Sequence, residues 1–139
     1  MFNNTIKFTI NWGDCDPAFI TFYPNYFKWF DEGTWALFRK AGCDPALLLS
    51  ERGVYIRLVD AQARFKQPGF VGDTVELESY VSEWRKRFFT VKHFLRRDKE
   101  LLLEGTEIRA WVTRHPEDTR RFKPVAIPED VRGALSIDC

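Results

Sequence analysis

The sequence is poor in the residues that most often carry enzyme chemistry. Only two of its 139 residues are histidines, His93 and His115, and only three are cysteines. It has no Gly-x-Ser-x-Gly motif, no glycine-rich phosphate loop and no Cys or His spacing typical of a metal site. Cys15 has no histidine near it in sequence that could generate a thiolate. These absences argue against a serine or cysteine hydrolase, a nucleotide-binding loop and a metalloenzyme, and we expect no metal and no cofactor.

Charge of one sign and long apolar runs are also scarce. The formal net charge of +1 argues against bulk attraction to nucleic acid or a membrane, so a polyanion site would have to be a local cluster of Lys and Arg. The longest apolar runs span only a few residues, too few to cross a bilayer. The N-terminal residues lack the pattern of a signal peptide, and the cysteines, at positions 15, 43 and 139, are odd in number. We therefore expect a reduced, cytoplasmic protein.

The sequence does contain enough apolar and aromatic residues for one folded domain, which we expect to span residues 1–139. Hydrophobic residues make up 45% of the chain and aromatic residues 16%. Residues 5–12 alternate between apolar and polar, which is typical of a half-buried strand. Over residues 24–41, apolar side chains recur at steps of three and four, which predicts a long helix that ends at Gly42. A second, short helix is expected over residues 44–53.

Beyond the second helix the apolar period falls to two residues. Strands are predicted near 54–66, 74–84, 87–97, 101–114 and 121–126, separated by turn residues. The short connections between them imply antiparallel pairing. One long helix can cover only one face of such a sheet, so the other face or an edge needs a partner, and self-association is the economical solution. The pattern therefore predicts an α+β domain in a homo-oligomer.

The most informative segment is the loop Gly13-Asp14-Cys15-Asp16-Pro17, just before the long helix. It places carboxylates near a helix N-terminus, whose free N–H groups and positive dipole end would polarise a carbonyl group. A carboxylate at that place could attack the carbonyl or activate water. Alternatively, Asp14 and Asp16 only shape the turn, as Asp often does.

The run G-D-C-D-P-A-x-I-x-x-Y-P-N-Y at residues 13–26, followed by an aromatic-rich helix with Asp31, resembles the 4-hydroxybenzoyl-CoA thioesterase family. Weaker matches at residues 51–53, 83–87 and 127–128 extend the similarity through most of the chain. The resemblance implies a hotdog fold, in which a curved antiparallel sheet of about five strands wraps a long central helix. It also implies the activity of an acyl-CoA thioesterase.

The resemblance assigns roles to the residues of the loop. The family's catalytic aspartate corresponds to Asp16 and its carbonyl-polarising group to the backbone amide of Tyr23, whereas Asp14 is expected to hold the loop. Whether Asp16 attacks the carbonyl or deprotonates water is left open. Phe19 stands where the family often has glycine. If that position needs a positive φ, Phe19 is strained; we expect instead that the loop tolerates Phe19, whose ring narrows or reshapes the acyl pocket.

Basic residues are expected to bind coenzyme A. Arg85 and Arg87, which flank Lys86 at the junction of two strands, and Arg121 correspond to family positions that hold the phosphates of coenzyme A, partly across a subunit interface. On a strand, Arg85 and Arg87 would share a face while Lys86 points away, and two guanidiniums side by side suit a phosphate group. The alternative is a solvated hairpin.

Two further residues are candidates for the acyl pocket. Asp31 lies two helical turns beyond Tyr23, at a position that the family uses near the acyl ring, but an exposed helix carboxylate is an equal alternative. Arg57 interrupts an apolar strand beside the expected thioester channel and could line the pocket or the surface. His93 is expected to be a packed or surface residue of a strand rather than a base. A hydratase, which would need an Asp–His pair near the helix, is therefore not favoured.

We therefore expect an acyl-CoA thioesterase that needs only water and acts on an aromatic, hydroxybenzoyl-like acyl-CoA. The family resemblance also implies dimers of hotdogs that assemble into a tetramer. The rival hypothesis is a non-catalytic hotdog module that binds an acyl carrier or single-stranded nucleic acid through its aromatic strands and residues 85–87. The near-neutral charge weighs against nucleic acid, and we expect neither a nucleic-acid nor a membrane partner.

Overall fold

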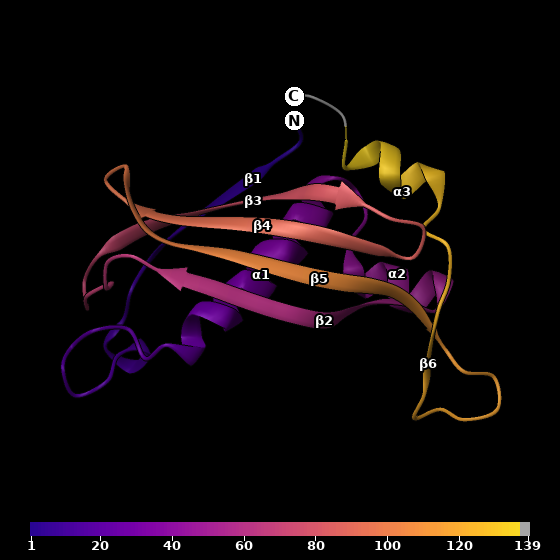
Figure 1. Cartoon of the computed structure of the whole chain (residues 1–139), viewed down its shortest axis with the longest axis horizontal. Helices are drawn as coiled ribbons and strands as arrows, with labels where there is room; N and C mark the ends of the chain where they lie inside the picture. The colour runs from indigo at the N-terminus through magenta and orange to yellow at the C-terminus, as the bar shows by residue number, and fades with distance from the viewer. Residues whose placement is uncertain (137–139) are drawn as a thin grey trace.

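The computed structural model describes residues 1–136 and has the predicted α+β fold of the hotdog type (Figure 1). Within these residues, six strands form one antiparallel sheet with the order β1-β3-β4-β5-β2, and β6 pairs with β5. The strands are β1 (Asn4–Thr9), β2 (Val54–Phe65), β3 (Thr74–Trp84), β4 (Phe88–Arg97), β5 (Glu100–Arg114) and β6 (Phe122–Pro124). The long helix α1 (Pro24–Lys40) crosses one face of the sheet, as the sequence predicts.

The helix α1 forms because its apolar residues share one face and its ends carry suitable residues. Pro24 occupies the first turn, where a missing N–H costs nothing, and Arg39 and Lys40 lie near the negative end of the helix dipole. The buried face carries Tyr26, Trp29, Phe30, Gly33, Thr34, Leu37 and Phe38. Gly33 permits a close approach to the sheet, because a Cβ at this position would lie 2.8 Å from Ser79 Oγ.

The core consists of two apolar clusters, one along each half of α1. Trp29 belongs to the cluster at the N-terminal half, and Phe38 belongs to the cluster at the C-terminal half. Burial of each such side chain contributes about 1.5–3 kcal/mol relative to exposure. On β4, Val91 belongs to one cluster and Leu95 to the other, with buried His93 between them. A polar layer therefore separates the two apolar halves of the core.

Three shorter elements complete the described chain. They are the 3-10 turn η1 (Trp12–Asp14) and the helices α2 (Pro45–Arg52) and α3 (Glu129–Ala134). The side chain of Asp44 accepts a hydrogen bond from the Ala46 amide at 3.0 Å at the start of α2, and Gly53, with a φ of 66°, ends it. The sequence did not predict α3, because its six residues carry a single buried side chain, Val131. None of the helices in residues 1–136 is long and apolar enough to span a membrane.

Strand β2 forms one edge of the sheet, and three of its large apolar residues are not covered by the rest of the described chain. Leu58, Val59 and Phe65 are all exposed, and β2 pairs only with β5. A bulge between Leu58 and Asp60 interrupts the pairing register with β5. An exposed apolar edge strand is a surface on which another strand can pair.

Candidate active site

Asp14 ties the loop before α1 to the start of the helix. Its Oδ2 accepts a hydrogen bond from the Asn11 amide at 2.8 Å. Its carbonyl oxygen accepts hydrogen bonds from the Phe22 amide at 2.8 Å and from the side-chain amide of Asn25, in the first turn of α1, at 2.9 Å. The prediction that Asp14 holds the loop is therefore confirmed.

Asp16 is held by one oxygen and has the other available. Its Oδ1 accepts a hydrogen bond from the Ala18 amide at 2.8 Å, so the side chain does shape the turn. Its backbone amide donates to the Ile20 carbonyl at 2.9 Å. Within the described residues, Oδ2 has no hydrogen-bond partner, and the side chain is partly exposed. The two roles considered for Asp16, in the turn and in chemistry, are therefore compatible.

Phe19 lies beside Asp16 in an unusual backbone conformation. Its φ is +65°, in the left-handed region that favours glycine, so the position does need a positive φ and Phe19 is strained, contrary to our expectation. The cost of such a conformation is about 1–2 kcal/mol. The ring packs against Trp12, with 5.4 Å between the centroids, and both rings border a cavity of about 240 Å³ together with Asp16. Phe19 therefore combines a strained backbone with a ring that lines the cavity beside the Asp16 carboxylate.

Two other sources of hydrolytic chemistry, a thiolate and a metal ion, are not provided by this loop. Desolvation raises the pKa of the Cys15 thiol, and the nearby carboxylates of Asp14 and Asp16 raise it further. The thiol is therefore protonated near neutral pH and is a poor nucleophile. Among residues 1–136, no three His, Cys, Asp or Glu side chains are grouped so that they could hold a metal ion.

The backbone N–H of Tyr23 is available for a ligand at the start of α1. Tyr23 caps this helix, and its amide has no acceptor among the described residues, although its carbonyl accepts from Tyr26 at 3.1 Å. Such a free N–H lies at the positive end of the helix dipole, where it can polarise a carbonyl oxygen. The Tyr23 amide therefore remains a candidate for the carbonyl-polarising group.

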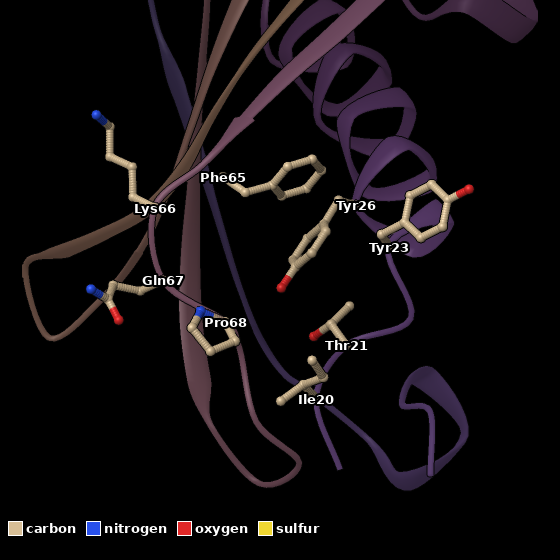
Figure 2. A pocket seen from close by; sticks show the side chains of 8 residues that line it. All are labelled: Ile20, Thr21, Tyr23, Tyr26, Phe65, Lys66, Gln67 and Pro68. Atoms are coloured by element: carbon tan, nitrogen blue, oxygen red, sulfur yellow. The ribbon is translucent and has the colours of Figure 1, made fainter. Parts of the chain in front are cut away.

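Tyr23 also borders a second cavity, of about 290 Å³. Figure 2 shows the rings of Tyr26 and Phe65 next to each other at this cavity, with 5.7 Å between their centroids, and the Tyr23 ring pointing away from them. The hydroxyl of Tyr26 accepts a hydrogen bond from the Gly69 amide at 3.1 Å, which holds the wall of the cavity. Asp16 borders the cavity beside Phe19 and not this one, so a single chain does not bring Asp16 and Tyr23 together in one pocket.

The basic run at residues 85–87 forms the connection between β3 and β4, not part of a strand. The expected strand alternation, with Arg85 and Arg87 on one face and Lys86 on the other, is therefore wrong. All three side chains are exposed, and Arg85 pairs with Glu83 at 3.1 Å. Figure 1 places this connection beside α3, at the opposite end of the sheet from the loop with Asp16. One chain alone does not bring the basic run and Asp16 into one site.

The other two expected arginines also lie away from Asp16. Arg121 is exposed just before β6, and its side chain has no partner among the described residues. Arg57 is exposed on β2 and lies over the Phe122 ring, 6.0 Å from its centroid, while its neighbour Ile56 faces the core. Arg57 therefore points to the face of the sheet away from α1, and within one chain it is a surface residue.

Asp31 is an exposed helix carboxylate, as one of the two alternatives has it, but it is not free of partners. It lies on the exposed side of α1, and its side chain is 57% exposed. Its Oδ1 nevertheless accepts a hydrogen bond at 2.7 Å from Nη2 of Arg109, whose side chain is only 1% exposed. Asp31 is therefore a surface carboxylate held from below by a buried cation.

The sequence reasoning missed a buried polar network to which Arg109 belongs. Ser79 Oγ lies 2.7 Å from His93 Nδ1, and His93 Nε2 lies 2.9 Å from Glu107 Oε1. Thr34 donates to the same oxygen of Glu107 at 2.5 Å, and Arg109 Nη2 donates to Glu107 Oε2 at 2.8 Å. With a proton on Nε2 of His93 and a lone pair on Nδ1, each of these contacts has one donor and one acceptor.

His93 and Arg109 stabilise the negative charge of Glu107. Burial alone would raise the pKa of Glu107, but the hydrogen bond from His93 and the positive charge of Arg109 outweigh it and hold the pKa at about 2. An acid–histidine pair therefore does lie next to α1, although the sequence showed none. Because His93 and Glu107 are 0% and 2% exposed, this pair cannot touch a substrate and does not support a hydratase.

A signal for the network was present in the alternation of β5. The buried positions of this strand include every second residue from Leu103 to Trp111, and Glu107 and Arg109 have the same parity. His93 likewise shares parity with the buried residues of β4. Inward-pointing polar residues on these adjacent strands could thus have been predicted to meet. Of the two alternatives expected for His93, a packed or a surface strand residue, the structure shows the packed one.

Comparison with known proteins places this geometry in a family. Residues 10–135 match the family model described as the thioesterase-like superfamily. A 4-hydroxybenzoyl-CoA thioesterase of Pseudomonas sp. (strain CBS-3) is 31% identical over 133 residues, which cover 91% of this chain and 92% of that protein. A solved structure of that enzyme has a TM-score of 0.88 and 29% identity, and the match covers 96% of this chain and 99% of that one.

Two further solved structures are similar over nearly the whole chain. A 4-hydroxybenzoyl-CoA thioesterase mutant complexed with 4-hydroxybenzoyl-CoA has a TM-score of 0.90 and 29% identity, and the match covers 98% of this chain and all (100%) of that one. A gentisyl-coenzyme A thioesterase has a TM-score of 0.82 and 27% identity, and the match covers 96% of this chain and 100% of that one. The chain therefore belongs to the thioesterase-like superfamily and is a thioester hydrolase with the hotdog fold.

Proposed function

We propose that the protein hydrolyses the thioester of an aromatic, hydroxybenzoyl-like acyl-CoA, with Asp16 as its catalytic carboxylate. The observation that carries this proposal is that two groups in the segment leading into α1, one Asp16 oxygen and the Tyr23 amide, have no hydrogen-bond partner among residues 1–136. Within one chain they border different cavities, so the proposed site needs a second subunit to complete it. The names of the similar proteins, which include 4-hydroxybenzoyl-CoA and gentisyl-coenzyme A thioesterases, support an aromatic acyl group.

The proposed chemistry divides between the two groups of the loop. The Tyr23 N–H and the positive end of α1 stabilise the charge that develops on the carbonyl oxygen. Asp16 then acts in one of two ways. Its carboxylate attacks the carbonyl carbon and expels the thiolate, leaving a mixed anhydride that water cleaves, or it takes a proton from a water molecule that attacks the carbon directly. Both routes give the free acid and coenzyme A.

Phe19 and Asp31 are proposed to contact the acyl group. The Phe19 ring narrows the cavity beside Asp16, so a flat ring is a better fit than a bulky branched chain. Asp31 lies eight residues after Tyr23 on α1, about 12 Å along the helix axis. An aromatic ring that extends from a carbonyl bound at Tyr23 would present a hydroxyl group toward the Asp31 carboxylate. Arg57 is the remaining acyl-pocket proposal, and it requires a second subunit.

The complete site is proposed to form between two subunits. A two-fold axis at the β2 edge would place the Asp16 end of one sheet next to the opposite end of its partner, where Arg85, Arg87 and Arg121 lie. The exposed apolar residues of β2 supply the surface for this contact. The three arginines would then hold the phosphates of coenzyme A, and two dimers would form a tetramer.

The assembly is testable by mass in solution. Light scattering at micromolar concentration should give the mass of a dimer or a tetramer, because the β2 edge is apolar and unpaired in one chain. A monomer mass together with full activity would contradict the shared site. We also propose a cytoplasmic location, in keeping with the two described cysteines, Cys15 and Cys43, being free thiols.

The decisive experiment for the catalytic proposal replaces Asp16 by asparagine. Asn keeps the size of the side chain and can still accept the hydrogen bond from Ala18, so the fold should survive. Thiol release from a panel of acyl-CoAs should be fastest with aromatic acyl groups, and Asp16→Asn should lower turnover at least ~10²-fold. Asp98→Asn, at an exposed turn aspartate, is the matched control and should leave turnover unchanged. Near-normal turnover by folded Asp16→Asn would remove Asp16 from the mechanism.

A further inference from the structure

A chain of hydrogen bonds connects the interior of the sheet to Asp31 on its surface. It runs from Ser79 through His93 and Glu107 to Arg109, whose Nη2 donates to both Glu107 and Asp31. Ser79, His93, Glu107 and Arg109 are all buried. Within the described part of the chain, Asp31 is therefore the one acidic end of this network that a ligand could touch.

Stability alone does not account for a charge buried at Arg109. Removal of a guanidinium and a carboxylate from water costs free energy, and such pairs often stabilise a protein no better than apolar residues of the same volume. The same face of β5 carries Leu103 and Trp111, so apolar side chains do occupy the neighbouring inward positions. The buried charge indicates a role beyond packing.

The surroundings of Arg109 fix its guanidinium in one orientation. Nη1 donates to the Ile56 carbonyl at 3.1 Å, and Nη2 and Nε face the two oxygens of Glu107 at 2.8 and 3.4 Å. Glu107 is in turn held by Thr34 and by His93. A planar guanidinium with this many contacts cannot rotate freely, which distinguishes it from a flexible lysine.

Asp31 gains a fixed position from this arrangement. A carboxylate on a helix surface ordinarily samples several rotamers, and a ligand that binds it must bear the cost of ordering it. Here Oδ1 is bound to Arg109 at 2.7 Å, whereas Oδ2 has no partner among the described residues. The free oxygen is therefore presented in one direction before any substrate arrives.

We propose that Arg109 is a positioning residue that fixes the Asp31 carboxylate for a polar substituent of the acyl group, and that Glu107 and His93 hold Arg109 in place for this task. The inference rests on the proposed aryl-CoA thioesterase function and adds residues that do not touch the substrate. A site prepared to accept a hydrogen bond discriminates strongly against an analogue without the donor, because its buried or ordered polar groups are then left unpaired. Arg109 thus acts on substrate choice more than on the chemical step.

The test compares 4-hydroxybenzoyl-CoA with benzoyl-CoA, which lacks the hydroxyl donor. The measured quantity is the ratio of kcat/KM for the two substrates in wild type, Asp31→Asn, Arg109→Lys and the double variant. Lysine keeps the positive charge but cannot span Glu107, Ile56 and Asp31 at once. Each single variant should lower the ratio roughly tenfold, and the double variant should lower it no further, because both act through one contact.

The control is Glu32→Gln, an exposed carboxylate on α1 next to Asp31 that has no partner in residues 1–136. It should leave the ratio unchanged. If Arg109→Lys does not fold, Glu107→Gln provides the test, because it keeps the shape of the side chain while weakening the hold on Arg109. The same fall in the ratio is expected for this variant.

The outcomes separate the inference from the function on which it rests. A folded Arg109→Lys or Glu107→Gln that slows both substrates by the same factor would make Arg109 merely structural and overturn the inference. Additive effects in the double variant would do the same. Equal wild-type rates with both substrates would also overturn it, yet leave the thioesterase proposal standing. Failure of the wild type to hydrolyse any aryl-CoA would reject both.

Discussion

The loop before α1 and the polar layer beneath the middle of α1 use carboxylates in opposite ways. Asp16 is partly exposed, spends one oxygen on the turn and keeps the other free. Glu107 is buried, and both of its oxygens are occupied by His93, Thr34 and Arg109. An unsatisfied carboxylate is suited to chemistry, and a saturated one is suited to holding other groups in place. The same functional group therefore has its role set by how many partners the fold gives it.

Removal of the saturated carboxylate should have the largest effect on stability. Glu107→Ala leaves Arg109 and His93 buried without their common acceptor, so the free energy of unfolding should fall by about 3–5 kcal/mol. Asp16→Asn, at the unsatisfied carboxylate, should change it by less than about 0.5 kcal/mol. Urea denaturation of both variants measures the difference. Equal losses of stability would show that the two carboxylates do not differ in the way described.

Lowering the pH should reduce the free energy of unfolding through the buried Glu107. Because the pKa of Glu107 is lowered to about 2 in the folded protein, its contribution is fully present above its unfolded pKa and is lost as pH falls through the folded value. The contribution is about 3 kcal/mol, and it should disappear between about pH 4.5 and pH 2. Urea unfolding over this range should show a steeper loss for wild type than for Glu107→Gln, which cannot titrate. Parallel curves would mean that Glu107 is not held ionised.

The basic connection between β3 and β4 provides the smallest expected effect. Arg85→Ala and Arg87→Ala should raise KM for acyl-CoA several-fold and leave kcat nearly unchanged, since exposed charged contacts are worth about 1 kcal/mol and act equally on ground and transition states. The control substrate is an acyl-pantetheine thioester without the nucleotide, for which KM should not change. If KM rises by the same factor for both substrates, the arginines do not contact the nucleotide.

The fold was largely predictable because its signals are local. The apolar alternation of β3 and the three- and four-residue steps of α1 gave boundaries within about a residue of those observed. The role of Asp14 was also readable, because the loop and the helix start are neighbours in sequence. By contrast, Asp31 and Arg109 are 78 residues apart, and no local pattern connects them. The placement of α1 across the sheet brings Asp31 to Arg109, and the pairing of β4 with β5 sets His93 near Glu107.

The face of β5 turned toward α1 also sets a size limit at Gly105. A Cβ at this position would lie 2.4 Å from two carbon atoms of the Phe30 ring. That ring stacks on His93 with 4.8 Å between the centroids. The absence of a side chain at Gly105 therefore allows α1 to pack this close to the sheet. One added methyl group there would tilt the ring and, through His93, the network that ends at Asp31. If Arg109 positions Asp31 as proposed, mutations that alter substrate choice are to be sought in the interior of this protein as well as in its pocket.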